Sequence, residues 1–147
     1  NILVGEGTAE KMKISVGCVY PREEETFMDV KGRCLLTGLP KTVTVSSEEM
    51  REAFEEPAEA ILESIHAVLE RTPPELVADV STNGIMMTGG GSLISGFDKL
   101  ITARTGIATT VAENAIACVA EGTGKSLDMI SDMPEGTINL SRRRQVN

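Results

Sequence analysis

The chain has 147 residues, of which 41% are hydrophobic and 24% charged, a composition typical of a folded globular domain rather than of a disordered chain. Its length allows one domain with a hydrophobic core and is too short for two independent domains. The formal net charge of −8 argues against nucleic acid as the main partner, because binding to phosphates needs clustered lysine and arginine. No hydrophobic stretch approaches the roughly 18 residues that a membrane-spanning helix needs.

The cysteines and the start of the chain give two further expectations. Cys18, Cys34 and Cys118 are far apart and form no C-x-x-C pair, and no signal peptide is recognisable, which suggests the reduced thiols of a cytosolic protein. The chain begins at Asn1, without a methionine, in a stretch that reads as the middle of a structural element. We therefore expect a fragment of a longer protein.

The first 45 residues are expected to combine a short helix with strands. By its pattern alone, the segment 8–16 fits a helix or a strand equally well. Residues 27–30 and 34–36 are predicted as strands, with residues 31–33 as a tight turn between them. Residues 41–45 alternate polar and β-branched side chains and predict a further half-buried strand.

A long helix is predicted from Ser46 onward. Ser46 can accept a hydrogen bond from the backbone of Glu49, whose carboxylate can reach back to the backbone N–H of Ser46, and this reciprocal pair is a capping box. Pro57 is expected to kink or split the helix, because proline removes a backbone donor. Pro74 is well placed to begin a new short helix over residues 75–79.

The remaining segments predict an α/β layer. Residues 84–88 are a short hydrophobic run, as expected for a strand buried on both faces. A helical stripe from Leu93 to Ile101 follows, with Gly106 as its C-terminal cap, and residues 107–111 predict another strand. Asn114 is predicted to cap a last helix. Strand, helix, strand and helix in close succession are typical of α/β proteins.

Three consecutive glycines, Gly89, Gly90 and Gly91, separate the predicted strand from Ser92 and the next helix. Without Cβ atoms, the backbone here can adopt positive φ and lie close to a flat base or a phosphate. The positive N-terminal end of the next helix would lie in the same place. The alternative is a strand-to-helix connection that needs tight packing, and the pattern alone leaves both open.

Other motifs do not predict catalysis. Residues 122–126 resemble the end of a G-x-x-x-x-G-K-[ST] phosphate-binding loop, but Val119 stands where its first glycine is needed and the segment has a helical pattern. His66, the single histidine, is expected on the surface of the long helix. Glu10 and Lys13 would form a solvent-exposed ion pair if their segment is helical. We predict no catalytic residue and no metal ligand in this chain.

The glycine turn and its surroundings resemble the MreB family, the bacterial actin homologues that organise cell shape. Residues 85–93, followed by residues 96–101, are similar to the adenosine motif of that family. Further blocks match in the family's order and spacing: residues 5–10 (family G-E-R-T-A-E), 30–33 (V-R-G-R), 36–42 (T-G-L-P-K-T), 72–76 and 118–124. The resemblance covers roughly residues 1 to 130, and several blocks are specific to MreB rather than to actins generally.

The resemblance implies an α/β, actin-like ATPase fold of the ribonuclease H-like class, of which this chain would hold roughly the second half. Residues 1–45 would belong to the small outer subdomain, residues 46–130 to the inner nucleotide-binding subdomain, and residues 131–147 to a tail. The segment 8–16 would then be a helix. The family's phosphate loops of the D-x-G-T and D-x-G-G-G-T types and its catalytic acid have no counterpart here, so this chain alone is not expected to hydrolyse ATP.

The resemblance also assigns the nucleotide contacts residue by residue. The turn that contacts the adenosine and phosphates corresponds to Gly89, Gly90, Gly91 and Ser92. The helix that closes over the adenine and ribose carries Glu10 and Lys13. The cofactor implied for the intact protein is ATP with Mg²⁺.

The same resemblance implies a cytoplasmic protein that is membrane-associated in its intact form and whose filaments guide cell-wall synthesis and rod shape. Its partners would be further protomers of the filament and the cell-wall elongation machinery, with membrane contact indirect through the missing half and no nucleic acid. Another actin-superfamily member, such as a cell-division ATPase or a chaperone nucleotide domain, is an alternative against which residues 36–42 and 72–76 weigh. A protein-interaction module, in which the glycines only pack, is a third hypothesis.

Overall fold

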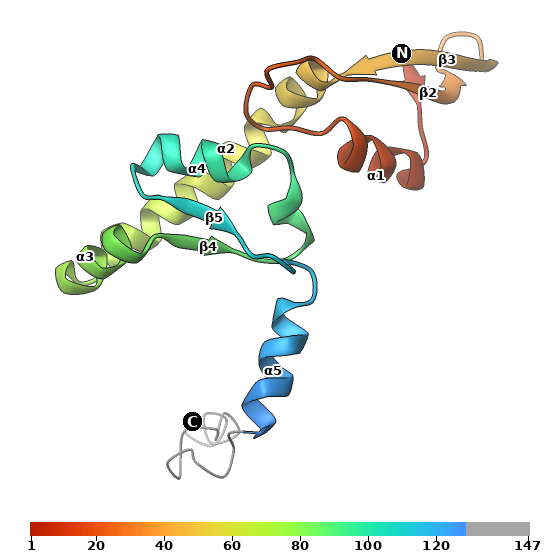
Figure 1. The fold of residues 1–147 in the computed structure, drawn as a ribbon. Coiled ribbons are helices and arrows are strands. Elements are labelled where there is room, and N and C mark those ends of the chain that lie inside the picture. The colour runs from red at the N-terminus through yellow and green to blue at the C-terminus, as the bar shows by residue number, and fades with distance from the viewer. Residues whose placement is uncertain (129–147) are drawn as a thin grey trace, which may run out of the picture.

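The computed structural model describes residues 1–128, so the tail expected at residues 131–147 lies outside the described residues. Two separate sheets are present, and the long helix α2 runs from one to the other (Figure 1). The elements in chain order are β1 (Ile2–Leu3), α1 (Glu6–Ser15), β2 (Phe27–Cys34), β3 (Pro40–Ser46), α2 (Ser47–Arg71), α3 (Pro74–Asn83), β4 (Ile85–Met87), the 3₁₀ helix η1 (Gly90–Leu93), α4 (Phe97–Thr105), β5 (Thr109–Val111) and α5 (Cys118–Asp128). This mixture of helices and strands is the predicted α/β class.

The first sheet is antiparallel, in the order β1–β2–β3, and α1 lies against β2 (Figure 1). The segment 8–16 is helical, as the resemblance implies, and α1 begins slightly earlier, with Gly5 as its N-terminal cap residue. Val16, directly after α1, and Val30 of β2 are both buried. Burial of these two side chains removes apolar surface from water at the end of α1 and in β2.

The turn predicted at residues 31–33 is wrong. β2 continues through these residues, and Gly32 pairs with Lys41 of β3. Glycine is needed there for close approach instead, because a Cβ at Gly32 would lie 2.4 Å from the carbonyl oxygen of Leu3 in β1. The chain reverses after β2, where Gly38 has a left-handed φ of 72°.

The long helix α2 spans 25 residues and begins as predicted. The Glu49 N–H donates to Ser46 Oγ at 3.3 Å, and the Ser46 N–H donates to the Glu49 carboxylate at 2.9 Å, so the capping box is confirmed. Of the two outcomes expected at Pro57, a kink or a split, the split is wrong, because α2 continues through the proline. Ala58 and Leu62, which follow the proline, are buried and hold the continuing helix against the core, which offsets the lost hydrogen bond.

The second sheet is a parallel pair of β4 and β5. Its core is built around Leu62 of α2 and Phe97 of α4, and Ile85 and Met87 of β4 pack against them. The side chain between the two, Met86, points to the opposite face and is 64% exposed. Parallel strands normally have both faces covered, but α2 and α4 cover one face, so the predicted burial of this strand on both faces is wrong for the described residues.

The segment after the glycines also differs from the prediction. η1 begins within the glycines, at Gly90, and α4 begins later, at Phe97, so Leu93 does not belong to the α4 stripe. The N-terminal end of α4 therefore does not lie at the glycine turn. Gly106 ends α4 with a φ of 73°, as predicted.

The last helix, α5, extends away from the parallel sheet (Figure 1). Its predicted start after Asn114 is wrong by about one turn, because the Asn114 carbonyl accepts from the N–H groups of Ala117 and Cys118 and closes a separate turn before the helix. Residues 122–126 lie inside α5, which confirms that they are not a phosphate-binding loop.

Candidate functional site

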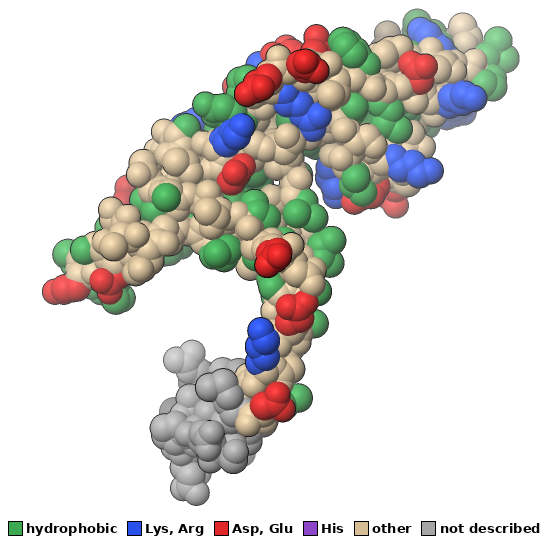
Figure 2. All heavy atoms as spheres, in the orientation of Figure 1, with side chains coloured by type: hydrophobic (Ala, Val, Ile, Leu, Met, Phe, Trp, Pro, Cys, Tyr) green, Lys and Arg blue, Asp and Glu red, His purple; other side chains and the backbone are tan. Residues whose placement is uncertain are grey.

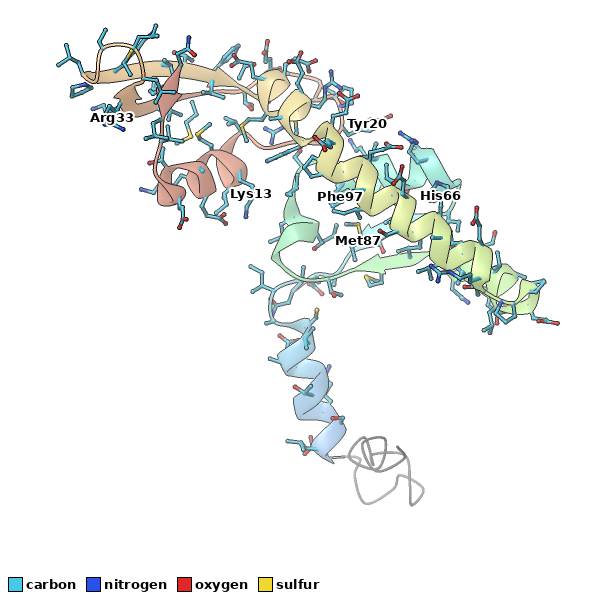
Figure 3. All side chains as sticks on the ribbon, turned by 180° about the vertical axis from the view of Figure 1, so that it is seen from behind. Lys13, Tyr20, Arg33, His66, Met87 and Phe97 are labelled. Atoms are coloured by element: carbon cyan, nitrogen blue, oxygen red, sulfur yellow. The ribbon has the colours of Figure 1, made fainter. Side chains whose placement is uncertain are left out.

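A cleft opens between α1 and the segment that starts at η1 (Figure 2). Its volume is 380 Å³, within the usual range of about 300–1,000 Å³ for small-molecule sites. Glu10 and Lys13 line one wall, and Gly90 and Gly91 line the opposite wall. Figure 3 shows Lys13 on the side of α1 that faces the parallel-sheet part of the molecule. Four of the residues predicted to contact a nucleotide are therefore brought together.

The three glycines differ in what the backbone requires of them. Gly89 has a left-handed φ of 83°, and its N–H donates to the Ala115 carbonyl at 2.6 Å, so it shapes the turn. Gly90 and Gly91 have no positive φ, and a Cβ on either would meet nothing within 4 Å. Neither conformation nor packing among the described residues requires glycine at these two positions. This argues against the tight-packing alternative and indicates space for a ligand.

The other two predicted contact residues, Gly89 and Ser92, do not line the cleft in this structure. Ser92 is buried, and its hydroxyl donates to the Gly89 carbonyl at 2.7 Å. This hydrogen bond closes the turn that presents Gly90 and Gly91 to the cleft. The direct contact of Gly89 and Ser92 with a nucleotide stays a prediction, and their contribution here is to support the wall.

The charged residues of the cleft form an ion pair. Lys13 Nζ lies 2.6 Å from the Glu10 carboxylate, and both side chains are well exposed. An exposed pair with this spacing contributes only about 0.5 kcal/mol to a helix, so the fold does not depend on it. The ammonium group can donate hydrogen bonds to the polar edge of a ligand, and the carboxylate can accept them.

Four aliphatic side chains complete the lining: Ile14, Leu93, Ile94 and Ile116. Three of them, Ile14, Leu93 and Ile116, are 73%, 56% and 71% exposed. Large aliphatic side chains gathered around one cleft indicate a ligand with apolar faces, because covering them removes apolar surface from water. The arrangement suits a flat ring held between aliphatic walls, with polar groups at its edge.

Sequence reasoning did not assign these aliphatic residues to the site. Leu93 carried a usable signal, since it directly follows the glycine turn. Ile116 carried none, because it reaches the cleft only through the pairing of the two parallel strands. The N–H of Ala112 donates to the Met87 carbonyl, and the N–H of Gly89 donates to the Ala115 carbonyl, so the turn after β5 lies beside the turn after β4.

The described residues outside the cleft add no metal site. Among residues 1–128, no group of three or more His, Cys, Asp or Glu side chains is arranged to hold a metal ion. His66 is exposed on α2, as predicted, and lies apart from Lys13 and the cleft (Figure 3). The cleft can therefore bind a ligand through its shape and through one cationic and one anionic side chain, Lys13 and Glu10.

Residues 1–135 match the model of the MreB/Mbl protein family, which is most of the chain. The chain belongs to the MreB/Mbl family. It is 45% identical over 134 residues to the cell shape-determining protein Mbl of Bacillus cereus, covering 91% of this chain and 40% of that protein. It is 43% identical over 136 residues to the cell shape-determining protein MreB of Escherichia coli K12, covering 92% of this chain and 39% of that protein. The MreB/Mbl chain thus spans about two fifths of the length of these curated relatives.

Two crystal structures of MreB5 of Spiroplasma citri have a similar fold. The structure bound to ADP has a TM-score of 0.85 at 35% identity and covers 91% of this chain and 42% of that chain. The structure bound to AMPPNP has a TM-score of 0.86 at 36% identity and covers 90% of this chain and 40% of that chain. The chain therefore has the predicted actin-like fold of the MreB family, and the family match decides against a cell-division ATPase or a chaperone domain.

Proposed function

We propose that this MreB/Mbl segment forms the adenosine side of an ATP-binding site in the full-length protein. Glu10 and Lys13 would contact the edges of the adenine and ribose, while Gly90 and Gly91 would lie against the ring. The observation that carries the proposal is that the two α1 charges face two glycines that neither φ nor packing requires. The ADP and AMPPNP complexes of MreB5 support the same class of ligand.

The cleft suits the nucleoside part of ATP better than its phosphates. Its lining is mostly aliphatic, and Lys13 is the one basic side chain among the lining residues. A triphosphate with Mg²⁺ needs several donors, and Mg²⁺ itself is bound through carboxylates together with phosphate oxygens. We assign that part of the chemistry to regions of the full-length protein outside this segment, and the segment alone is not expected to hydrolyse ATP.

The proposed division into subdomains follows the two sheets. Residues 1–45, proposed as the small outer subdomain, contain α1 and nearly all of the antiparallel sheet. Residues 46–130, proposed as the inner subdomain, contain the parallel pair and its helices within their described part. ATP would then be held where the outer subdomain meets the inner one, with Gly89 and Ser92 supporting the inner wall.

In the cell, the full-length protein would assemble with copies of itself into filaments that lie along the membrane on its cytoplasmic side and guide cell-wall synthesis and rod shape. Family membership and the function stated in the names of its relatives, cell shape-determining protein, support this proposal. The cell-wall elongation machinery would be the partner. None of the helices in the described part of this segment could span a membrane. Membrane contact would be made by the remainder of the full-length protein, as it is in the proposed family role.

Calorimetric titration of the full-length protein with ATP and Mg²⁺ tests the ligand, and GTP tests the selectivity for the base. Lys13→Ala should weaken ATP binding without changing thermal stability, since the lost ion pair is exposed. Lys11→Ala is the matched control, because Lys11 is exposed on the same helix and does not line the cleft. Filaments formed with ATP should be visible by electron microscopy. A parent protein that binds no nucleotide would contradict the proposal and favour the protein-interaction module.

A further inference from the structure

The two walls of the cleft are joined behind it by a short parallel pairing. The segment that leaves α1 passes through Cys18 and Val19, and the segment that leaves η1 passes through Ser95. Cys18 and Ser95 form a parallel bridge, and the Val19 N–H donates to the Ser95 carbonyl at 3.0 Å. Because both segments follow the cleft walls within a few residues, the distance between α1 and η1 depends on how closely they pair.

Gly96 directly follows this pairing and lies against Tyr20. Its φ is 79°, and a Cβ there would lie 2.5 Å from Tyr20 Cβ, 3.3 Å from Tyr20 N and 3.4 Å from Tyr20 Cα. Real side chains do not approach so closely, so glycine permits both the backbone conformation and the contact. A side chain at this position would push the α1 segment away from the η1 segment.

The segment after α1 makes two further hydrogen bonds. The Arg22 guanidinium donates to the Gly17 carbonyl at 3.0 Å. The Cys18 thiol is buried and donates to the Ser47 carbonyl at the start of α2, with an Sγ to oxygen distance of 3.2 Å. The first bond lies within the segment, whereas the second ties it to α2, so a shift that relieves a clash at Gly96 would strain the Cys18 contact.

We infer that Gly96 is a positioning residue that sets the width of the cleft, although it does not line it. The inference rests on the proposed function, ATP binding in the cleft, and adds that adenosine affinity depends on the contact of Gly96 with Tyr20 behind the cleft. A side chain at Gly96 moves Glu10 and Lys13 away from the opposite wall, so that one ring no longer contacts both walls.

The test compares Gly96→Ala with Gly106→Ala in the full-length protein. Gly106 has a φ of 73°, close to that of Gly96, but a Cβ on Gly106 would meet nothing within 4 Å, and this glycine does not line the cleft. Both variants carry the strain of a left-handed alanine, so both should lower the Tm. Only Gly96→Ala carries the clash, and we expect it to weaken ATP binding at least tenfold, whereas Gly106→Ala should stay within twofold of the parent.

A second substitution distinguishes an effect on the width of the cleft from an effect on the stability of the protein. Tyr20→Gly removes the atom nearest to the added methyl group, so the double variant Gly96→Ala/Tyr20→Gly should regain most of the lost affinity. The backbone strain at Gly96 remains in the double variant, so its Tm should stay low. Affinity that returns without a return of Tm supports a positioning role. Affinity that follows Tm across all variants would overturn it.

Hydrogen exchange of the Val19 amide in the parent protein is a test that needs no variant and serves if Gly96→Ala does not fold. Saturating ATP should slow this exchange, because a ligand that bridges both walls stabilises the pairing that protects the amide. Equal exchange with and without bound ATP, or equal ATP affinity of Gly96→Ala and Gly106→Ala, overturns the inference. A parent protein that binds no ATP contradicts the proposed function itself, so the two failures are distinct.

Discussion

The substitution Gly90→Val adds an isopropyl group to the cleft wall at a position where the fold leaves room. Gly90 is not among the residues with positive φ, and a Cβ there would meet nothing within 4 Å. The backbone therefore imposes no left-handed strain on a side chain here, and its Cβ meets no described residue. We expect the free energy of unfolding to change by no more than about 0.5 kcal/mol, as for other substitutions that remove no contact.

Binding should respond far more strongly than stability. The added group would occupy the wall that faces Glu10 and Lys13 across a cleft of 380 Å³. Inserting carbon atoms into a close-packed contact costs about 1–3 kcal/mol. This range corresponds to a loss of ATP affinity of roughly 5-fold to 150-fold at 25 °C.

Isothermal titration of the full-length protein with ATP and Mg²⁺ measures the affinity, and thermal unfolding measures the stability. Gly124→Val is the control, since Gly124 also has open surroundings and does not line the cleft. The control should bind ATP as the parent does. Unchanged ATP affinity in Gly90→Val would refute the argument that this glycine adjoins the ligand, and a large fall in its Tm would refute the argument that packing does not require it.

Three further predictions concern the fold and one of its thiols. Leu62→Ala should lower the free energy of unfolding by about 2–5 kcal/mol because the side chain is 1% exposed, whereas Ile61→Ala, 45% exposed on the same helix, should cost less than half as much in urea titrations. Glu49→Ala should cost about 1 kcal/mol by opening the capping box of α2, with a matching fall in Tm. The pKa of Cys34 is lowered from its usual value near 9 to about 7, chiefly by a hydrogen bond from the Thr37 side chain. Between pH 7 and pH 9 the Cys34 thiol therefore binds more protons in the unfolded state than in the folded state, so the free energy of unfolding should rise over this range. An equal rise in Thr37→Val would contradict the assignment of the pKa shift to the Thr37 hydrogen bond.

Signals confined to one or two turns of the chain were sufficient to predict several element ends. The capping box of Ser46 and Glu49 and the left-handed Gly106 both act within a few residues of their own position, and both are confirmed. The predicted turn around Gly32 failed for the opposite reason. That glycine meets the distant strand β1, and a local pattern does not distinguish a glycine needed for a turn from one needed for close approach.

The candidate site divides in the same way. Local pattern identified the glycine turn and the pair Glu10 and Lys13, and the resemblance to a family assigned them to one ligand. Only the tertiary structure brought them to opposite walls of one cleft, together with Ile116. It also showed that neither backbone conformation nor packing requires glycine at Gly90, whereas Gly89 shapes the turn.

By itself, then, the sequence determined the class of fold, the start of α2, the end of α4 and the family whose motif the glycines resemble. The tertiary structure decided which face of β4 is covered, which glycines have open space around them, and that Gly96 lies against Tyr20. The physical reason is the separation along the chain of the residues that interact. Caps and turns are formed by neighbours in the chain, whereas a cleft is formed by segments that meet only after the strands have paired.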